Sequence, residues 1–124
     1  MYNLENIDIN KLNTKEEIAV EAFKVILAIN GGCITRRRCV TGHKPTAFFE
    51  FYGYNEGNIE IVVNKTGWFS VLERDTDAHT EEEFYQNLVI FRFFEDYKTL
   101  EEEKDQLKKL VALAKELTKE EPKC

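Results

Sequence analysis

The chain has 124 residues, a formal net charge of −6, and 43% hydrophobic against 32% charged residues. This composition is typical of one globular domain, and the acidity argues against a dedicated nucleic-acid binder, whose phosphate contacts need clustered lysines and arginines. No apolar run approaches the ~20 residues that span a bilayer, and the first ten residues lack the features of a signal peptide. We therefore expect a cytoplasmic protein without a membrane partner.

The first predicted helix covers residues 15–29. The preceding residues, 1–13, show no clear period and are expected to form a loose arm. Thr14 and Glu17 have the spacing of a capping box, and apolar residues then recur at helical intervals. The sequence Asn30-Gly31-Gly32 ends the helix, because glycine accepts the left-handed conformation of a C-cap. Further apolar residues predict burial on more than one side of this helix. They are Val20, Phe23 and Leu27.

Several short segments after this helix have the composition of antiparallel strands. Residues 87–94 could also be helical, but we prefer a strand because the next helix has its own start signal at Thr99 and Glu102. Gly57 lies in a turn, where it can take a positive φ. In the segment 59–63, Ile59, Ile61 and Val63 share one face. The expected strands are residues 33–41, 46–54, 59–63, 68–73 and 87–94.

The final predicted helix covers residues 99–118. It carries a narrow stripe of leucines, interrupted by Glu103, and its remaining surface is nearly all glutamate and lysine. Such a stripe is typical of a helix packed on a sheet and is too short for a dimer seam. The sequence thus predicts a single α+β domain over residues 1–124. An antiparallel sheet of about four to five strands would have the N-terminal and C-terminal helices packed on one face, and 119–124 would form a tail.

The cysteines do not indicate a redox or metal site. In a regular strand over 33–41, Cys33 and Cys39 would stand roughly 20 Å apart, whereas a disulfide needs Cα atoms within about 7 Å. The chain has three cysteines, an odd number that suits a reducing compartment. Between Cys33 and Cys39, Arg36 and Arg38 share a face of this strand. They either discourage aggregation at a sheet edge or contact carboxylates of a partner.

An acidic segment, residues 73–83, is the second candidate site. Its residues Asp75, Asp77 and His79 alternate as at the start of a calcium loop, but the glycine and the distal glutamate of that loop are out of register. We therefore expect no metal and no cofactor. The negative charge can instead imitate the phosphates that a basic, nucleic-acid-binding protein contacts. The acidic residues are Glu73, Asp75, Asp77, Glu81, Glu82 and Glu83.

Aromatic residues make up 12% of the chain, more than a small core requires, and some are expected to anchor a partner. The candidates are Tyr52, Tyr54 and Trp68.

Catalysis has weak support. A Cys39–His43 dyad can be drawn, but nothing supplies a third, orienting group or an oxyanion motif. The sequence carries no nucleotide-binding or hydrolase fingerprint.

The sequence therefore favours a small acidic inhibitor that acts by binding another protein, and its charge favours a basic partner. A bacterial immunity protein that neutralises a nuclease-type toxin fits, as does a phage inhibitor of a defence complex. A secretion-type chaperone acting as a homodimer also fits, and light scattering would distinguish it from a monomeric inhibitor. The sequence leaves open two further functions, a small enzyme using Cys39 and His43 and a regulatory subunit with no separate activity.

Overall fold

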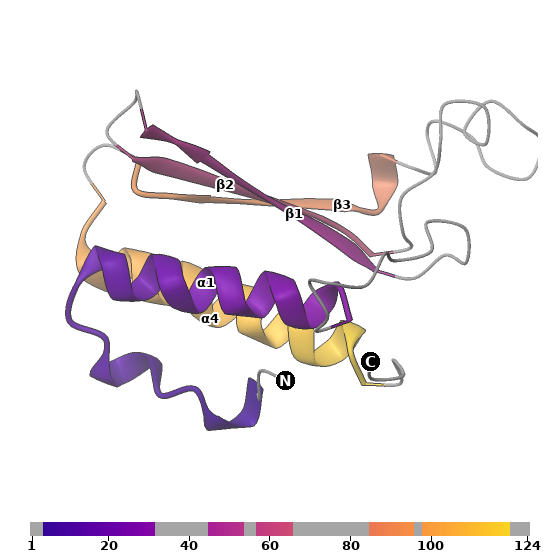
Figure 1. Ribbon diagram of the computed structural model, residues 1–124, viewed down its shortest axis with the longest axis horizontal. Helices are drawn as coiled ribbons and strands as arrows, with labels where there is room; N and C mark the ends of the chain where they lie inside the picture. The colour runs from indigo at the N-terminus through magenta and orange to yellow at the C-terminus, as the bar shows by residue number, and fades with distance from the viewer. Residues whose placement is uncertain (1–3, 32–44, 54–56, 66–84, 96–97, 120–124) are drawn as a thin grey trace, which may run out of the picture.

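The computed structural model describes residues 4–31, 45–53, 57–65, 85–95 and 98–119. Within these residues the chain is α+β, with one three-stranded antiparallel sheet in the order β1-β2-β3. Figure 1 shows helices α1 and α4 side by side beneath this sheet. The elements are η1 (Leu4–Asn6), η2 (Ile9–Lys11), α1 (Lys15–Ile29), β1 (Thr46–Tyr52), β2 (Asn58–Asn64), β3 (Leu88–Phe93) and α4 (Leu100–Leu117).

The structure confirms both predicted helices and three of the predicted strands, including the strand preferred over a helix at 87–94. The strands expected at 33–41 and 68–73 lie outside the described residues. The segment expected to be a loose arm is described from Leu4 onward, where it forms η1 and η2. Leu4 and Leu12 are buried, and both short helices contact α4.

Both long helices begin at the predicted caps. The Oγ1 atom of Thr14 accepts a hydrogen bond from the Glu17 backbone N–H at 3.1 Å. Thr99 and Glu102 form a complete capping box, in which each side chain bonds the other residue's backbone N–H. At the other end of α1, Gly31 takes a φ of 98°, the left-handed conformation expected of a C-cap glycine.

The sheet buries the face that lies against the helices. Ile59, Ile61 and Val63 of β2 point to this inner face, as the alternation in the sequence predicts. In β1 the inner face includes Phe49, whose ring meets the ring of Phe23 from α1 edge-on at 5.4 Å. The hairpin between β1 and β2 contains Gly57 with a φ of 82°, which explains the glycine at that position.

Helix α1 is fully buried on one side and partly exposed on another in the described structure. Ile18, Val25 and Ile29 are fully buried, but Val20 is 53% exposed and Phe23 is 46% exposed. Leu27, the third residue of the predicted second buried side, is half-buried, so in the described structure that side is covered only in part. Apolar periodicity reports that a face is hydrophobic, and it does not reveal whether the same chain covers that face.

Helix α4 buries a continuous stripe, and Glu103 belongs to it. Glu103 has 0% of its surface exposed, as do Leu107 and Leu110 on the same stripe, so this residue does not interrupt the stripe as the sequence suggested. Its Oε1 atom accepts a hydrogen bond from the Phe94 backbone N–H at 3.0 Å. Phe94 has a φ of 64°, rare for a residue other than glycine. The buried carboxylate thus holds the strained link between β3 and α4.

Burial raises the pKa of Glu103 above its ordinary value of 4.5. The hydrogen bond from Phe94 and the positive charges of Lys98 and Lys15 oppose this shift only in part, and the charge of Glu102 adds to it. The second carboxylate oxygen, Oε2, has no hydrogen-bond partner among the described residues. The ionised form of Glu103 is therefore less stable in the folded protein than in water.

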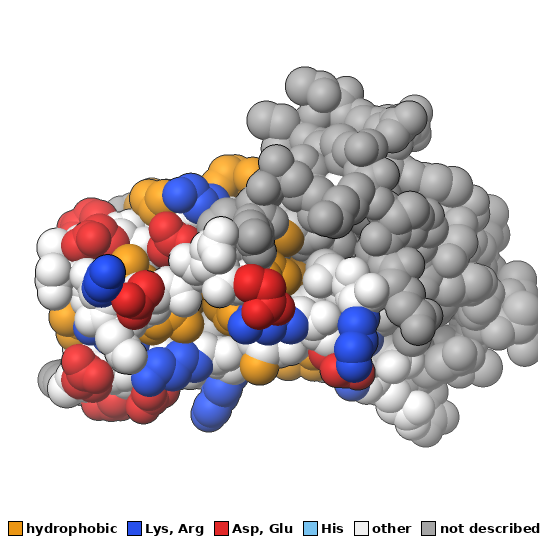
Figure 2. Space-filling model, turned by 90° about the horizontal axis from the view of Figure 1, so that it is seen from below, with side chains coloured by type: hydrophobic (Ala, Val, Ile, Leu, Met, Phe, Trp, Pro, Cys, Tyr) orange, Lys and Arg blue, Asp and Glu red, His pale blue; other side chains and the backbone are white. Residues whose placement is uncertain are grey.

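The helix side of the molecule carries charges of both signs. In Figure 2, which views this side, acidic and basic side chains alternate over the described part. Several form ion pairs three residues apart, such as Lys108 with Asp105 at 3.9 Å and Lys104 with Glu101 at 3.8 Å. In the part of the chain that the structure describes, no helix combines the length and the hydrophobicity needed to cross a membrane.

Candidate protein-binding surface

The sheet face directed away from the helices, which we call the outer face, carries side chains of alternate residues from all three strands. Because strand side chains alternate, the residues between the buried ones share this face. The strand register arranges them in rows that run across the sheet. The outer face includes Phe48, Glu50 and Tyr52 of β1, Glu60 and Val62 of β2, and Ile90 and Arg92 of β3.

One row of the outer face is apolar. Phe48 lies opposite Val62, and Val62 lies opposite Ile90, so the three side chains form a line across the sheet. Phe48 is 38% exposed and Ile90 is 45% exposed, whereas Val62 between them is half-buried. An exposed apolar row of this kind supplies area that a partner protein can cover.

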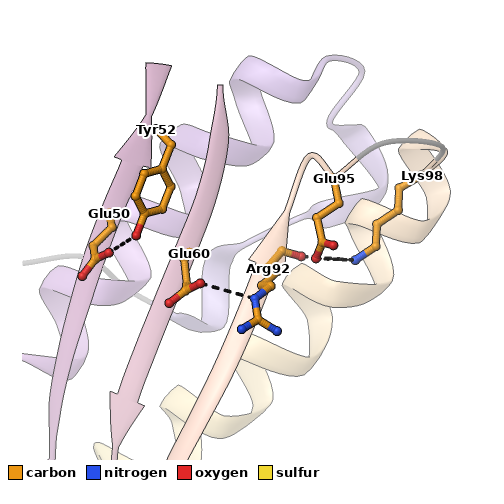
Figure 3. A network of polar contacts seen from close by, with 6 residues as sticks. All are labelled: Glu50, Tyr52, Glu60, Arg92, Glu95 and Lys98. Atoms are coloured by element: carbon orange, nitrogen blue, oxygen red, sulfur yellow. Dashed lines mark hydrogen bonds and ion pairs between the residues drawn. The ribbon is translucent and has the colours of Figure 1, made fainter. Parts of the chain in front are cut away.

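The next row is charged. Glu50 lies directly opposite Glu60, and Glu60 lies opposite Arg92. Figure 3 shows these side chains on one side of the sheet with the helices behind it. Arg92 Nε lies 3.3 Å from Glu60 Oε2, and the Tyr52 hydroxyl donates a hydrogen bond to the Glu50 carboxylate. The row thus places two carboxylates side by side, with one arginine at its β3 end.

The pairing of Glu50 with Glu60 works against the sheet. Like charges directly opposite in an antiparallel pair are destabilising, by a few tenths of a kcal/mol up to about 1 kcal/mol. Arg92 compensates Glu60, and the Tyr52 hydroxyl supports Glu50 with a neutral donor. The backbone of Arg92 is held by Lys98, whose Nζ donates a hydrogen bond to the Arg92 carbonyl oxygen at 3.3 Å. An added cation between the two carboxylates would be attracted to both.

Of the site residues expected from the sequence, the structure describes Tyr52. It is half-buried and lies at the hairpin end of β1. The others lie outside the described residues, as do Cys39, His43 and His79. They are Arg36, Arg38, Tyr54, Trp68, Glu73, Asp75, Asp77, Glu81, Glu82 and Glu83.

The described residues that flank two of the predicted site segments, 33–41 and 73–83, lie at the same end of the sheet. The arginine-containing segment 33–41 lies between α1 and β1, whose ends meet where the Asn30 side chain exchanges two hydrogen bonds of 2.8 Å with the backbone of Ala47. The acidic segment 73–83 lies between β2 and β3, whose ends meet where Lys65 N–H bonds Asn87 O at 3.0 Å. Tyr52 stands at the opposite end, about 20 Å away by strand rise. The structure therefore does not bring Tyr52 to the attachment points of these segments.

The sequence reasoning missed Glu50, Glu60 and Ile90. A usable signal was present, because assigning Ile59, Ile61 and Val63 to the inner face places Glu60 and Val62 on the outer one. The juxtaposition of Glu50 with Glu60 also needs the hairpin register, which follows only when the length of the turn around Gly57 is fixed.

Comparisons with known proteins supply no function for this chain, so the functional argument depends on its own residues. No protein family, no curated protein and no solved structure matches this chain.

Proposed function

We propose that this protein is a small acidic inhibitor that binds a basic protein through the outer face of its sheet. The observation that supports the proposal is the carboxylate pair of Glu50 and Glu60 beside the exposed apolar row. The partner would be a nuclease-type toxin, as for a bacterial immunity protein, or a nucleic-acid-targeting defence complex, as for a phage inhibitor. Both classes of partner carry lysines and arginines that normally contact phosphates.

The two rows would divide the work of binding. The apolar row of Phe48, Val62 and Ile90 would form the dehydrated centre of the interface, where aromatic and aliphatic side chains contribute most of the affinity. A lysine or arginine of the partner between Glu50 and Glu60 would replace a repulsion with two attractions. The charges would therefore determine which partner binds and how fast it arrives.

The acidic segment 73–83 would extend this surface. It joins β3 at the end of the sheet where Thr46, Asn64 and Leu88 form a row, and the apolar row is the next one along. The apolar row thus lies between the Glu50–Glu60 pair and the attachment of the segment. If residues 33–41 and 68–73 add the strands expected from their composition, the sheet would reach up to five strands. Arg36 and Arg38 would then supply a basic edge for carboxylates of the partner.

The test begins with the partner. Tagged chain is used to capture proteins from extracts of the native host, and the captured protein is identified by mass spectrometry and purified. Association rates are then measured over a range of salt concentrations for wild type, for the double variant Glu50→Gln/Glu60→Gln, and for a variant neutralised at Asp75, Asp77, Glu81 and Glu82. We expect both variants to associate about tenfold more slowly at low salt and to lose much of the salt dependence.

A matched control removes the same charge elsewhere. Glu101→Gln/Asp105→Asn neutralises two exposed carboxylates on α4, in the layer opposite the outer face. This variant should associate within about twofold of wild type if position rather than net charge matters. Equal rates for the outer-face variant and wild type would contradict the proposal, as would an acidic captured partner.

A second candidate function, a homodimeric secretion-type chaperone, is favoured by a separate observation. Val20 and Phe23 of α1 are apolar and about half exposed, which suits either self-association or the holding of an unfolded segment. The chaperone function would be supported if the captured protein bound only while its binding segment was unfolded. The inhibitor requires binding to a folded partner, so a comparison of native and denatured partner separates the two functions.

A further inference from the structure

Helix α1 presents a second, mainly apolar stripe that the described part of the chain covers only in part. Glu16, Val20, Phe23 and Leu27 follow one another at intervals of four, three and four residues, so they line one side of the helix. Val20 is 53% exposed and Phe23 is 46% exposed, whereas Leu27 is half-buried. We call these four residues the α1 stripe. It lies in the helix layer, and the outer face of the sheet points away from that layer.

The apolar surface continues from the α1 stripe onto β1. The ring of Phe23 contacts the ring of Phe49 at 5.4 Å, and Phe51, two residues further along the same face of β1, is 63% exposed. Helix α1 and strand β1 run in opposite directions in Figure 1. The contact between Phe23 and Phe49 therefore joins the apolar surface of the α1 stripe to β1, which adds area that another helix can cover.

The charges around the α1 stripe match a second copy of the same helix. Glu16 and Lys24 lie four residues before and after Val20, or about 6 Å along the helix axis on either side of it. When two α1 helices cross antiparallel at Val20, each Glu16 therefore faces the Lys24 of the other copy. A parallel crossing would instead bring Glu16 against Glu16. Lys24 is 46% exposed in its side chain and now pairs with Glu21 at 3.5 Å, so it can also reach a neighbouring helix.

We propose that two copies of this protein form a symmetric dimer by antiparallel packing of the α1 stripe, with Val20 at the two-fold axis. Phe23 of each copy would pack beside Val20 of the other, and two Glu16–Lys24 pairs would flank this centre. The interface is self-complementary, as a two-fold axis requires. Glu16 in the stripe and Lys24 beside it supply both signs of charge, so this surface suits its own copy better than the basic partner proposed for the outer face. The dimer would leave the outer face open and does not rest on the proposed function. An inhibitor that binds through the outer face would then also be dimeric, so the comparison of native and denatured partner, and not oligomeric state, would separate it from the chaperone.

The test measures oligomeric state on the full chain by sedimentation velocity across a range of protein concentrations. We expect wild type to dimerise and Val20→Glu to be monomeric, because the two new carboxylates would meet at the axis. Glu16→Lys and Lys24→Glu should each weaken dimerisation about tenfold, and the double variant Glu16→Lys/Lys24→Glu should restore most of the affinity because the pairs re-form with opposite polarity. Circular dichroism verifies that every variant is folded.

Ile90→Glu provides a matched control, since it places a carboxylate at a similarly exposed apolar position on the outer face. It should dimerise like wild type. Three results would overturn the proposal. They are a wild type that stays monomeric at every concentration, a dimer that Val20→Glu leaves unchanged, and a double charge reversal that fails to recover the affinity lost in the single variants. The partner-capture experiment is independent of all three.

Discussion

Helices α1 and α4 begin alike and end up in different environments. Each starts at a threonine whose hydroxyl accepts a hydrogen bond from the backbone N–H of a glutamate three residues later. Helix α4 then buries one stripe and surrounds it with charges, several of them in ion pairs with spacing i,i+3. Helix α1 buries one side as well, yet keeps Val20 and Phe23 exposed on another. The same kind of N-terminal cap therefore does not determine how much of a helix surface is buried by the rest of the chain.

The difference has a physical meaning. A hydrophobic side chain that stays in water gains nothing from folding, whereas burial contributes about 25 cal/mol for each Å² removed from water. The stripe of α4 therefore stabilises the fold, and the α1 stripe is available to stabilise an association. Substitutions in the two stripes should affect different equilibria, and this expectation can be tested directly.

The largest effect should come from comparing Leu107→Ala in α4 with Val20→Ala in α1. Leu107 is fully buried, so its truncation should lower the free energy of unfolding by about 2–5 kcal/mol. Val20→Ala should change the stability of the monomer by less than about 0.5 kcal/mol. Urea denaturation at two protein concentrations measures both. A large loss for Val20→Ala in dilute protein would show that the chain itself covers this residue and would remove the contrast between the helices.

The second effect concerns the one carboxylate in the buried stripe of α4. Because burial raises the pKa of Glu103, the folded state holds its proton more tightly than the unfolded state does. The stability contributed by this proton is fully present below the ordinary pKa of 4.5 and is lost as the pH rises through the higher folded value. Ionised Glu103 therefore weakens the fold at neutral pH.

We expect Glu103→Gln to make unfolding less dependent on pH. Glutamine keeps an oxygen that can accept the Phe94 N–H and carries no charge, so it should match or exceed wild type at pH 7 and lose that advantage as the pH falls towards 4.5. Glu103→Leu removes the acceptor and should cost about 1–3 kcal/mol relative to the glutamine variant. Chemical denaturation at several pH values from 4 to 7 provides the comparison. A difference between wild type and Glu103→Gln that stays constant with pH would show that Glu103 does not titrate differently in the folded state.

Much of the fold could be predicted from local signals. The helix boundaries were close because the threonine caps and the glycine C-cap act within a few residues, and such interactions are visible in the sequence. The inner face of β2 followed from the alternation of Ile59, Ile61 and Val63 for the same reason. The role of Glu103 was missed because it depends on Phe94, nine residues earlier, whose backbone N–H reaches the carboxylate only in the folded chain.

The candidate site was less accessible to sequence reasoning. Tyr52 was identified from its aromatic character, but its neighbour Glu50 gains meaning only when the strand register sets it opposite Glu60. The acidic segment 73–83 was prominent because its charges are contiguous, and this form of clustering needs no folding to be seen. Glu50 and Glu60, in contrast, lie ten residues apart in the sequence and become neighbours only when β1 pairs with β2.

The smallest expected effect is the difference in stability lost when each of the two helix caps is removed. Thr99 takes part in a complete capping box, whereas Glu17 bonds the backbone N–H of Asn13, one residue before the Thr14 cap. Replacing either threonine with alanine should cost about 1 kcal/mol, and we expect Thr99→Ala to cost more because both reciprocal bonds of the box depend on the geometry of its cap. Thr→Ser at each site keeps the hydroxyl and should restore most of the loss. An equal cost at both caps would mean that the second hydrogen bond of the box contributes little, and the helices would then differ only in what covers them.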